Sequence, residues 1–397
     1  MNVLLLSFYF PPDLSAGSFR MESLVASMRE CLPQSSHITV ITTSPNRYDS
    51  FDASAPAIEF LDRVTIHRIA LPVHRSGMLD QTRAFATFAW NAISIVRRVQ
   101  PDIVVATTSR LMTGVLGAWA ARHHGAPYYL DVRDIFVDTI GDVLPPSASL
   151  IFKPIMSALE QWAVLTASRV NLVSPGFLPY FSQRYPTRNF SIFTNGVDDA
   201  FLEQGNSEPV SVSLPRQVLK VLYAGNLGEG QGLHHILPQL TKHLGRSVQF
   251  IVVGDGGRRI ALETALTALP EHSVRLLNPV KRSELIGMYQ EADVLFVHLN
   301  DLPAFEKVLP SKLFEYAATG KPIWAGLAGY PAKFAREEIE NVAIFDPGDA
   351  MGAVTSLKTL QLRTIDRRKF TESYRRTTIM NSMAYEIWKI ARTAGAN

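Results

Sequence analysis

The sequence is short of charge and close to electrically balanced. Only 19% of its 397 residues are Asp, Glu, Lys or Arg, against about 25% in typical soluble domains. A disordered chain is excluded, because disordered chains are charge-rich and apolar-poor, whereas 47% of this one is hydrophobic. Lys and Arg exceed Asp and Glu by 39 − 36 = 3. A dedicated nucleic-acid-binding protein needs a strongly basic face and is disfavoured.

Cysteine and long apolar runs are also scarce. Cys31 is the only cysteine, which excludes an intrachain disulfide and a cysteine-ligated zinc site. We therefore expect a reducing, cytoplasmic location. No uncharged apolar run reaches the ~20 residues of a membrane span. The apolar start lacks a basic segment and stops at Pro11, so it favours a first strand over a signal peptide.

Several motifs of common enzyme classes are missing. The sequence has no G-x-G-x-x-G fingerprint, no H-E-x-x-H, no C-x-x-C and no D-x-D. The phosphate-loop pattern fails because Gly320-Lys321 is followed by Pro322. A nicotinamide oxidoreductase, a P-loop kinase and a zinc hydrolase all lose their best support. We expect no metal site and no tightly bound cofactor.

Short β-branched strands alternate with helical stretches along the chain. This alternation predicts parallel sheets covered by helices on both faces. Strands are expected at 3–8, 37–41, 64–69, 103–106, 128–132, 170–173 and 191–193, and then at 218–223, 248–253, 274–276, 294–297, 323–325 and 342–345. The fold class is therefore α/β.

The alternation breaks at residues 205–217, which are rich in Ser, Pro and Gly. This composition predicts a linker between two doubly wound, Rossmann-like domains that face each other across a cleft. The domains are expected at 1–204 and 218–378. A last helix, within 379–397, is expected to pack back on the first domain.

A glycine-rich turn follows the strand predicted at 218–223. It includes Gly225, Asn226, Gly228 and Gln231 and leads directly into a helix. Such a turn presents backbone N–H groups and a helix N-terminus, which suit a diphosphate. The alternative is a tight turn that uses glycine for positive φ. Gly254, in a second turn, is as consistent with a plain turn as with a ligand.

Residues 309–322 predict a short helix that begins after Pro310 and ends near Gly320. Ser311 lies in its first turn, where a phosphate could be held by the hydroxyl and the helix end. Glu315, four residues later, shares that face and could accept ribose hydroxyls. The alternative is a capping serine and solvated charges. Lys312 and Leu313 are further candidates here.

Two turns of the first domain could bind an acceptor. Residues 131–134 concentrate charge just after a predicted strand, and residues 11–20 form the first strand-to-helix turn. An internal Arg–Asp ion pair and a purely structural turn are equally consistent with these residues. The candidate acceptor ligands are Gly17, Ser18, Arg20, Asp131 and Arg133, and Asp134 is a candidate catalytic residue.

Together these segments resemble the retaining glycosyltransferases of family 4, which have the GT-B fold, over nearly the whole chain. The likeness is greatest to a subgroup that builds bacterial O-antigens and capsules and includes N-acetyl-L-fucosamine transferases. The residues that carry it lie at 11–18, 131–134, 194–198, 223–233, 254–256, 291–297 and 310–322.

The resemblance implies a nucleotide-sugar donor, with UDP as the expected nucleotide, bound mostly by the second domain. Glu315 matches the ribose-binding glutamate of the family, and the turn from Gly225 matches the loop under the diphosphate. Val280 falls where backbone groups bind the nucleotide base in the family. Asp134 falls near the family's position that contacts the transferred sugar or the acceptor. Transfer is expected to retain anomeric configuration without a metal. The expected acceptor is a saccharide or a polyprenyl-diphosphate-linked sugar.

Two departures from the family pattern concern charge. The first glutamate of its pair falls at Lys307, with Glu306 one residue away, and the usual Arg and Lys of the glycine loop are Asn226 and Gln231. We hypothesise that Lys307 or Lys312 supplies the missing positive charge.

Aromatic and basic residues occur together at 75–98, as on helices that lie on anionic membranes. An ordinary helix covering a sheet explains this pattern equally well. Two other functions remain open. A nucleotide-sugar 2-epimerase or hydrolase would act on the donor alone, and a catalytically silent scaffold protein would need no donor.

Overall fold

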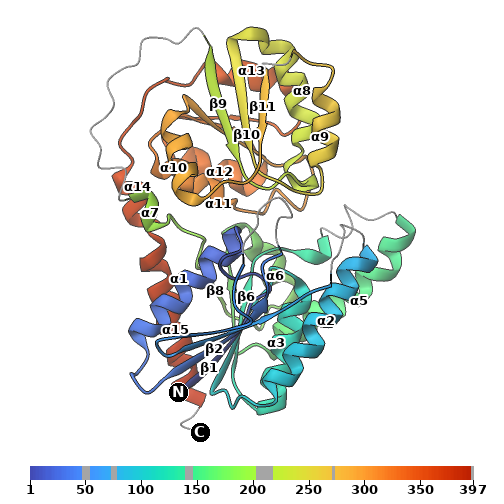
Figure 1. Cartoon of the computed structure of the whole chain (residues 1–397), viewed down its shortest axis with the longest axis vertical. Helices are drawn as coiled ribbons and strands as arrows, with labels where there is room; N and C mark the ends of the chain where they lie inside the picture. Colours follow the sequence, from blue (N-terminus) through green and yellow to red (C-terminus); the bar gives the residue numbers. More distant parts are fainter. Residues whose placement is uncertain (47–53, 73–77, 139–145, 203–217, 271–272, 395–397) are drawn as a thin grey trace. The chain divides into compact units, whose positions relative to one another are not determined.

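The computed structural model of the chain describes residues 1–46, 54–72, 78–138, 146–202, 218–270 and 273–394, with only the backbone of residues 78, 79, 146–148 and 151. The chain forms two compact units (Figure 1). Unit 1 contains Met1–Asn195 and Arg376–Asn397, and unit 2 contains Gly196–Arg375. The chain leaves unit 1 once and returns to it for its last helix.

Unit 1 is built on a sheet with the strand order β3-β4-β2-β1-β5-β6-β7-β8. All of its pairings are parallel except that of β3 with β4. The strands are β1 Asn2–Leu6, β2 His37–Thr43, β3 Ile58–Leu61, β4 Val64–Ile69, β5 Ile103–Thr107, β6 Tyr128–Val132, β7 Arg169–Leu172 and β8 Phe190–Ser191. The central strands are buried along their whole length, as expected of a sheet covered on both faces.

Helices cover both faces of this sheet. On one face α3 packs against α2 and α5, and on the other α1 packs against α15 (Figure 1). The helices are α1 Ala16–Cys31, α2 Met78–Val96, α3 Leu111–His124, α5 Pro146–Thr166, α6 Leu178–Arg184 and α15 Arg376–Ala394. Met380, Met383 and Ile387 of α15 are fully buried in the same core cluster as Leu24 of α1.

Unit 2 has a fully parallel sheet with the order β11-β10-β9-β12-β13-β14. Its strands are β9 Leu219–Ala224, β10 Val248–Val253, β11 Val274–Leu277, β12 Val294–His298, β13 Ile323–Gly326 and β14 Val342–Phe345. Its helices are α7 Asp199–Leu202, α8 Leu233–Leu244, α9 Arg259–Leu266, α10 Arg282–Glu291, α11 Ser311–Ala318, α12 Gly329–Glu338, α13 Ala350–Leu357 and α14 Arg368–Ser373. Two hydrophobic clusters, one on each face of the sheet, form its core.

The first unit ends earlier than the sequence predicts. Residues 1–204 were expected in the first domain, but the boundary lies between Asn195 and Gly196. The physical reason is that Val197 and Phe201 are buried in the core of unit 2. The linker predicted at 205–217 lies outside the described residues. Within the described residues, no helix combines the length and the apolar character that crossing a bilayer requires.

Candidate functional site

The candidate site in unit 2 lies where its strand order reverses. β10 and β11 extend the sheet from one side of β9, and β12 begins its extension on the other side. In open α/β sheets ligands bind at the carboxyl ends of the strands at such a switch point. The glycine-rich turn follows β9, and the segment leading to α11 follows β12. The fold therefore brings two of the predicted segments to one edge of the sheet.

Side chains within the glycine-rich turn fix its shape. The Asn226 side-chain amide donates to Gln231 Oε1 at 2.9 Å, and the Gly228 N–H donates to the same oxygen at 3.1 Å. The Tyr223 hydroxyl donates to the Asn226 carbonyl at 2.6 Å. Asn226 and Gln231, the two residues that depart from the family pattern, thus hold the loop together.

The glycine at position 254 is explained by packing. Its φ of 151° is unfavourable for other residues, and a Cβ there would lie 1.8 Å from the carbonyl oxygen of Gly225. The Gly225 N–H donates to the Val253 carbonyl at 2.9 Å. The turn at Gly254 therefore packs directly against the glycine-rich turn, and this packing accounts for the glycine without a ligand.

His298, at the end of β12, also holds the glycine loop. Its Nδ1 lies 2.7 Å from the Gln231 carbonyl, and its Nε2 accepts the Gly348 N–H at 3.2 Å. Burial lowers the pKa of His298 to about 4, so the ring is neutral at pH 7 and donates through Nδ1. Sequence reasoning missed this residue, because a histidine inside an apolar strand carries no signal of its contacts.

The first turns of α11 carry a buried carboxylate with two donors. Glu315 Oε2 accepts from the Lys312 ammonium at 2.8 Å and from the Tyr289 hydroxyl at 3.0 Å. Only 10% of the Glu315 side chain and 22% of the Lys312 side chain are exposed. Burial and the Glu315 charge raise the pKa of Tyr289 well above its usual value, so it remains a donor. A Cβ at Gly225 would lie 3.4 Å from Lys312 Cε, which places the lysine next to the glycine loop.

The other predicted ligands of unit 2 occupy different environments. Ser311 is the first residue of α11 and is half-buried, while Pro310 is the N-cap, so the serine does not cap the helix. Leu313 is fully buried in the core and its N–H donates to the Pro310 carbonyl at 3.1 Å, which corrects its assignment as a ligand. Val280 is half-buried just after β11, and Lys307 is half-buried after β12.

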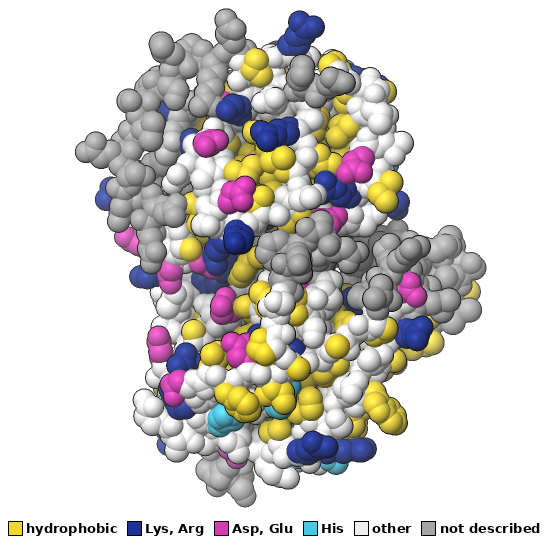
Figure 2. All heavy atoms as spheres, in the orientation of Figure 1, with side chains coloured by type: hydrophobic (Ala, Val, Ile, Leu, Met, Phe, Trp, Pro, Cys, Tyr) yellow, Lys and Arg dark blue, Asp and Glu magenta, His cyan; other side chains and the backbone are white. Residues whose placement is uncertain are grey.

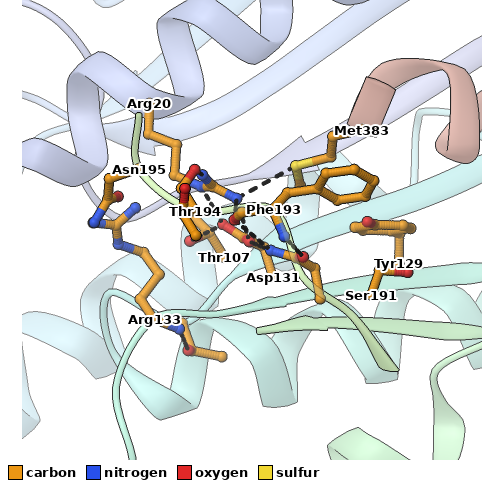
Figure 3. Close-up of polar contacts among 12 residues, drawn as sticks. Arg20, Thr107, Tyr129, Asp131, Arg133, Ser191, Phe193, Thr194, Asn195 and Met383 are labelled. Atoms are coloured by element: carbon orange, nitrogen blue, oxygen red, sulfur yellow. Dashed lines mark hydrogen bonds and ion pairs between the residues drawn. The ribbon is translucent and has the colours of Figure 1, made fainter. Parts of the chain in front are cut away.

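In unit 1, two of the predicted acceptor ligands form a buried ion pair (Figure 3). Arg20 and Asp131 are both 0% exposed. The guanidinium donates to the two carboxylate oxygens at 3.1 and 3.0 Å and to the Phe193 carbonyl at 2.8 Å. Asn171 donates to the carboxylate at 2.7 Å. Both assignments are corrected, because side chains that are buried and satisfied internally cannot reach an acceptor.

The remaining predicted residues of unit 1 lie near the carboxyl ends of β1 and β6. Arg133 follows β6, its N–H donates to Thr108 Oγ1 at 3.0 Å, and its side chain extends toward Asn195 (Figure 3). Asp134 is exposed. Gly17 and Ser18 lie in the first turn of α1, where Ser15 caps the helix. In unit 2, the described residues that could together offer three metal ligands are Glu229, which precedes α8, and His234 and His235 in the first turn of α8.

Comparison with protein families identifies both halves of the chain. A family described as "Glycosyl transferase 4-like domain" matches residues 21–196, and one described as "Glycosyl transferases group 1" matches residues 208–377. Among curated proteins, the chain is 21% identical over 338 residues to a protein of Escherichia coli K12 that bears the name "Putative colanic acid biosynthesis glycosyl transferase WcaI". That match covers 81% of this chain and 82% of WcaI.

Three solved structures match nearly the whole length of this chain. A sucrose-phosphate synthase from Thermosynechococcus elongatus matches with a TM-score of 0.66 and 14% identity, covering 100% of this chain and 98% of that one. Anabaena HepE in complex with UDP-glucose matches with a TM-score of 0.62 and 15% identity, covering 100% of this chain and 98% of that one. A Burkholderia xenovorans trehalose-phosphate synthase in complex with glucose-6-phosphate matches with a TM-score of 0.68 and 14% identity. It covers 98% of this chain and 100% of that one. At these identities the matches establish the fold.

Proposed function

The chain belongs to the family 4 glycosyltransferases and has the GT-B fold, and on that basis we propose the reaction that it catalyses. A sugar, which we propose to be an N-acetylated deoxysugar, moves from a UDP-linked donor to an acceptor in bacterial surface polysaccharide synthesis. The anomeric configuration is retained and no metal takes part. The HepE structure contains UDP-glucose, which supports a UDP-linked donor, and the mention of colanic acid in the name of WcaI supports the acceptor class.

The observation that carries this proposal is the Glu315–Lys312 pair beside the glycine loop. The described hydrogen bonds of Glu315 both fall on Oε2, which leaves Oε1 for a ribose hydroxyl. Lys312 lies next to Gly225, where its ammonium could move onto a diphosphate oxygen. Backbone N–H groups of the loop and of α11 provide further donors.

Sugar transfer mainly requires stabilisation of the leaving diphosphate and orientation of the acceptor hydroxyl. In the proposed reaction the anomeric carbon–oxygen bond breaks with oxocarbenium character, and negative charge grows on the diphosphate facing Lys312. The acceptor hydroxyl attacks from the same face and passes its proton to a donor phosphate oxygen. We propose that the exposed Asp134 carboxylate contacts the sugar or the acceptor.

Nucleotide release distinguishes this proposal from the other two functions. The protein is incubated with UDP-, GDP-, ADP- and dTDP-sugars, with and without saccharide acceptors, and both free nucleoside diphosphate and isomerised nucleotide-sugar are measured. A transferase releases UDP only when the acceptor is present. Without an acceptor, equal release of UDP would favour a hydrolase, and conversion of the donor to an isomeric UDP-sugar would favour a 2-epimerase. The lack of any turnover or thermal shift would favour a scaffold.

Removing the Lys312 charge should slow transfer. Lys312→Ala takes away a cation beside the leaving group, and loss of one charge-assisted contact of about 1.5–3 kcal/mol corresponds to a roughly 10- to 150-fold fall in kcat/KM. Lys307→Ala tests the other candidate, and Lys333→Ala is the control, since it removes a 66% exposed ammonium of the same unit. Unchanged turnover in both site variants would refute the hypothesis that Lys307 or Lys312 supplies the positive charge missing from the glycine loop.

The membrane interpretation of residues 75–98 becomes more specific in the structure. Arg75 lies outside the described residues, but α2 exposes 80% of Trp90 together with Arg83, and Arg97, directly after the helix, is also exposed. α5 exposes Leu150 and Ile155, at 79% and 50%. Figure 2 shows hydrophobic and basic side chains on the side of unit 1 that carries α2 and α5. We propose that these two helices contact an anionic bilayer carrying a lipid-linked acceptor.

Vesicle flotation tests this contact. The wild-type protein should float with phosphatidylglycerol vesicles and remain behind with neutral phosphatidylcholine vesicles. The Trp90→Glu, Ile155→Glu variant should lose flotation, because each substitution places a negative charge against the bilayer. Ile260→Glu is the control, since Ile260 is 78% exposed on unit 2. A wild-type protein that does not float with anionic vesicles would rule the contact out.

A further inference from the structure

Three side chains of metal-binding type lie together where the glycine-rich turn of unit 2 meets α8. Glu229 belongs to the end of that turn, and His234 and His235 are in the first turn of α8. One ligand atom from each of the three lies within 4.8 Å of the others, and the two imidazole rings have their centroids 3.9 Å apart. Zinc ligands lie about 2.0–2.2 Å from the ion. Small rotations of these side chains therefore bring all three to bonding distance of one ion.

The ring of His234 is buried without hydrogen bonds to account for it. Only 10% of its side chain is exposed, and its Nδ1 is buried with no partner among the described residues. Its Nε2 lies 4.0 Å from Glu229 Oε2, which is beyond hydrogen-bonding distance. Buried polar atoms almost always have a partner, and one without a partner costs free energy. A metal ion that takes the lone pair of an imidazole nitrogen provides such a partner.

Backbone hydrogen bonds fix the segment that carries the three side chains. The carbonyl of Glu229 accepts from the Gly232 N–H and from the Asn300 side-chain amide, both at 3.1 Å. The Asn300 N–H donates to the Gly230 carbonyl at 2.8 Å. Gly232 has a φ of 59°, in the left-handed region, and leads the chain directly into α8. The spacing of the ligands is therefore set before an ion binds, which lowers the entropic cost of binding.

Arg258 is bound to the same carboxylate oxygen that faces His234. Its Nε donates to Glu229 Oε2. Arg258 directly precedes α9, which packs against α8 (Figure 1). The Arg258 side chain is 52% exposed and that of Glu229 is 34% exposed, and ion pairs of this kind contribute little to stability. The guanidinium can therefore move into water when a stronger partner takes the oxygen.

The chemistry of the three side chains selects the kind of ion. Two imidazoles and one carboxylate suit Zn²⁺ and its relatives Co²⁺ and Ni²⁺, and three protein ligands leave a fourth position for water. Mg²⁺ and Ca²⁺ prefer sites made of oxygen atoms alone. The spacing E-x-x-x-x-H-H, from Glu229 to His235, differs from the H-E-x-x-H and D-x-D patterns that the sequence lacks. The absence of those patterns therefore gave no information about this cluster.

We propose that Glu229, His234 and His235 bind a Zn²⁺-type divalent ion where the glycine-rich turn enters α8. The ion replaces Arg258 at Glu229 Oε2 and links the end of the turn to the helix. Because only the folded protein holds the three ligands together, the ion should also raise the thermal stability of unit 2. This site does not depend on the proposed function, and it is separate from the proposed transfer reaction, in which no metal takes part.

Calorimetric titration of the chelator-treated, tag-free full chain with ZnCl₂ tests the site. Wild type should bind Zn²⁺ tightly and MgCl₂ not at all, and Co²⁺ should give the intense visible bands of a tetrahedral complex. Glu229→Gln and His235→Ala should each weaken Zn²⁺ binding at least about 10-fold, and His235 is exposed, so its removal leaves the fold intact. His243→Ala, which removes an exposed histidine of the same helix, should have no effect.

Arg258→Ala should act in the opposite direction. It removes the competitor for Glu229 Oε2, so it should tighten Zn²⁺ binding by about 2- to 5-fold, as expected for the loss of a weak exposed pair. Arg246→Ala removes an exposed cation just beyond the other end of α8 and should change the affinity little. Weaker binding by Arg258→Ala would contradict the exchange between the ion and the guanidinium. No tight Zn²⁺ binding by wild type, or wild-type affinity in both Glu229→Gln and His235→Ala, would overturn the site.

Discussion

Arg20→Met is expected to destabilise unit 1 by about 3–5 kcal/mol, the cost of breaking a buried ion pair from one side. Arg20 and Asp131 are completely buried, and Asn171 and Thr107 alone would remain as donors to the carboxylate. Urea denaturation measures the loss. Tryptophan fluorescence reports mainly on unit 1, which holds Trp90, Trp119, Trp162 and Trp388, while Trp324 is in unit 2.

Two further variants test whether the loss comes from the unpaired charge. Arg20→Met combined with Asp131→Asn removes both charges and should recover more than half of the lost stability, because the penalty lies in the uncompensated carboxylate. Arg29→Met breaks an exposed pair with Asp62 and should cost about 1 kcal/mol or less. A wild-type urea midpoint for Arg20→Met would show that the buried pair contributes little.

The effect of Arg20→Met should depend on pH. Burial acts to raise the pKa of Asp131, but the charge and hydrogen bonds of Arg20 outweigh it and hold this pKa below its usual value. In the wild-type protein this stabilisation is present above the unfolded pKa of about 3.9 and is lost as the pH falls through the lower folded value. Without Arg20, burial raises the folded pKa of Asp131. Protonation of Asp131 then removes the cost of burying an unpaired carboxylate. The difference in the free energy of unfolding between variant and wild type should therefore become smaller as the pH falls from 7 to 4.

The fold was largely predictable because the strands of parallel sheets are buried and apolar. Val64–Ile69, Tyr128–Val132, Val248–Val253 and Val342–Phe345 were predicted with the bounds that the structure has, and the α/β GT-B class is confirmed. Ile58–Leu61 was missed. This antiparallel edge strand has no fully buried residue, so it lacks the apolar signal that identified the others.

The site was predictable only where backbone geometry determines it. Glycine spacing and the proline before Ser311 located the loop and the helix of unit 2 without information about partners. Side-chain pairing was different. Arg20 and Asp131 are 111 positions apart, and nothing in the local pattern distinguishes an arginine that binds a ligand from one that binds a buried aspartate. Tyr289, which orients Glu315, was missed for the same reason.

Glu315→Gln should produce the second large effect, a loss in donor binding. The carboxylate is held in place by Lys312 and Tyr289, and an oriented carboxylate can accept ribose hydroxyls in charge-assisted hydrogen bonds of about 1.5–3 kcal/mol each. The substitution keeps the shape of the side chain but removes its charge, and the amide nitrogen that replaces one oxygen cannot accept a hydrogen bond. We expect a roughly 10- to 150-fold rise in the KM for the donor.

A modified donor separates this role from a structural one. Wild-type enzyme should use a 2′-deoxy-UDP-sugar much less well than the UDP-sugar, because the buried carboxylate loses its hydroxyl partner. Glu315→Gln should discriminate little between the two, since the interaction is already weakened. Glu337→Gln, which removes a 58% exposed carboxylate of the same unit, should discriminate like wild type. Full discrimination by Glu315→Gln would assign the ribose contact to another residue and leave Glu315 as the partner that positions Lys312.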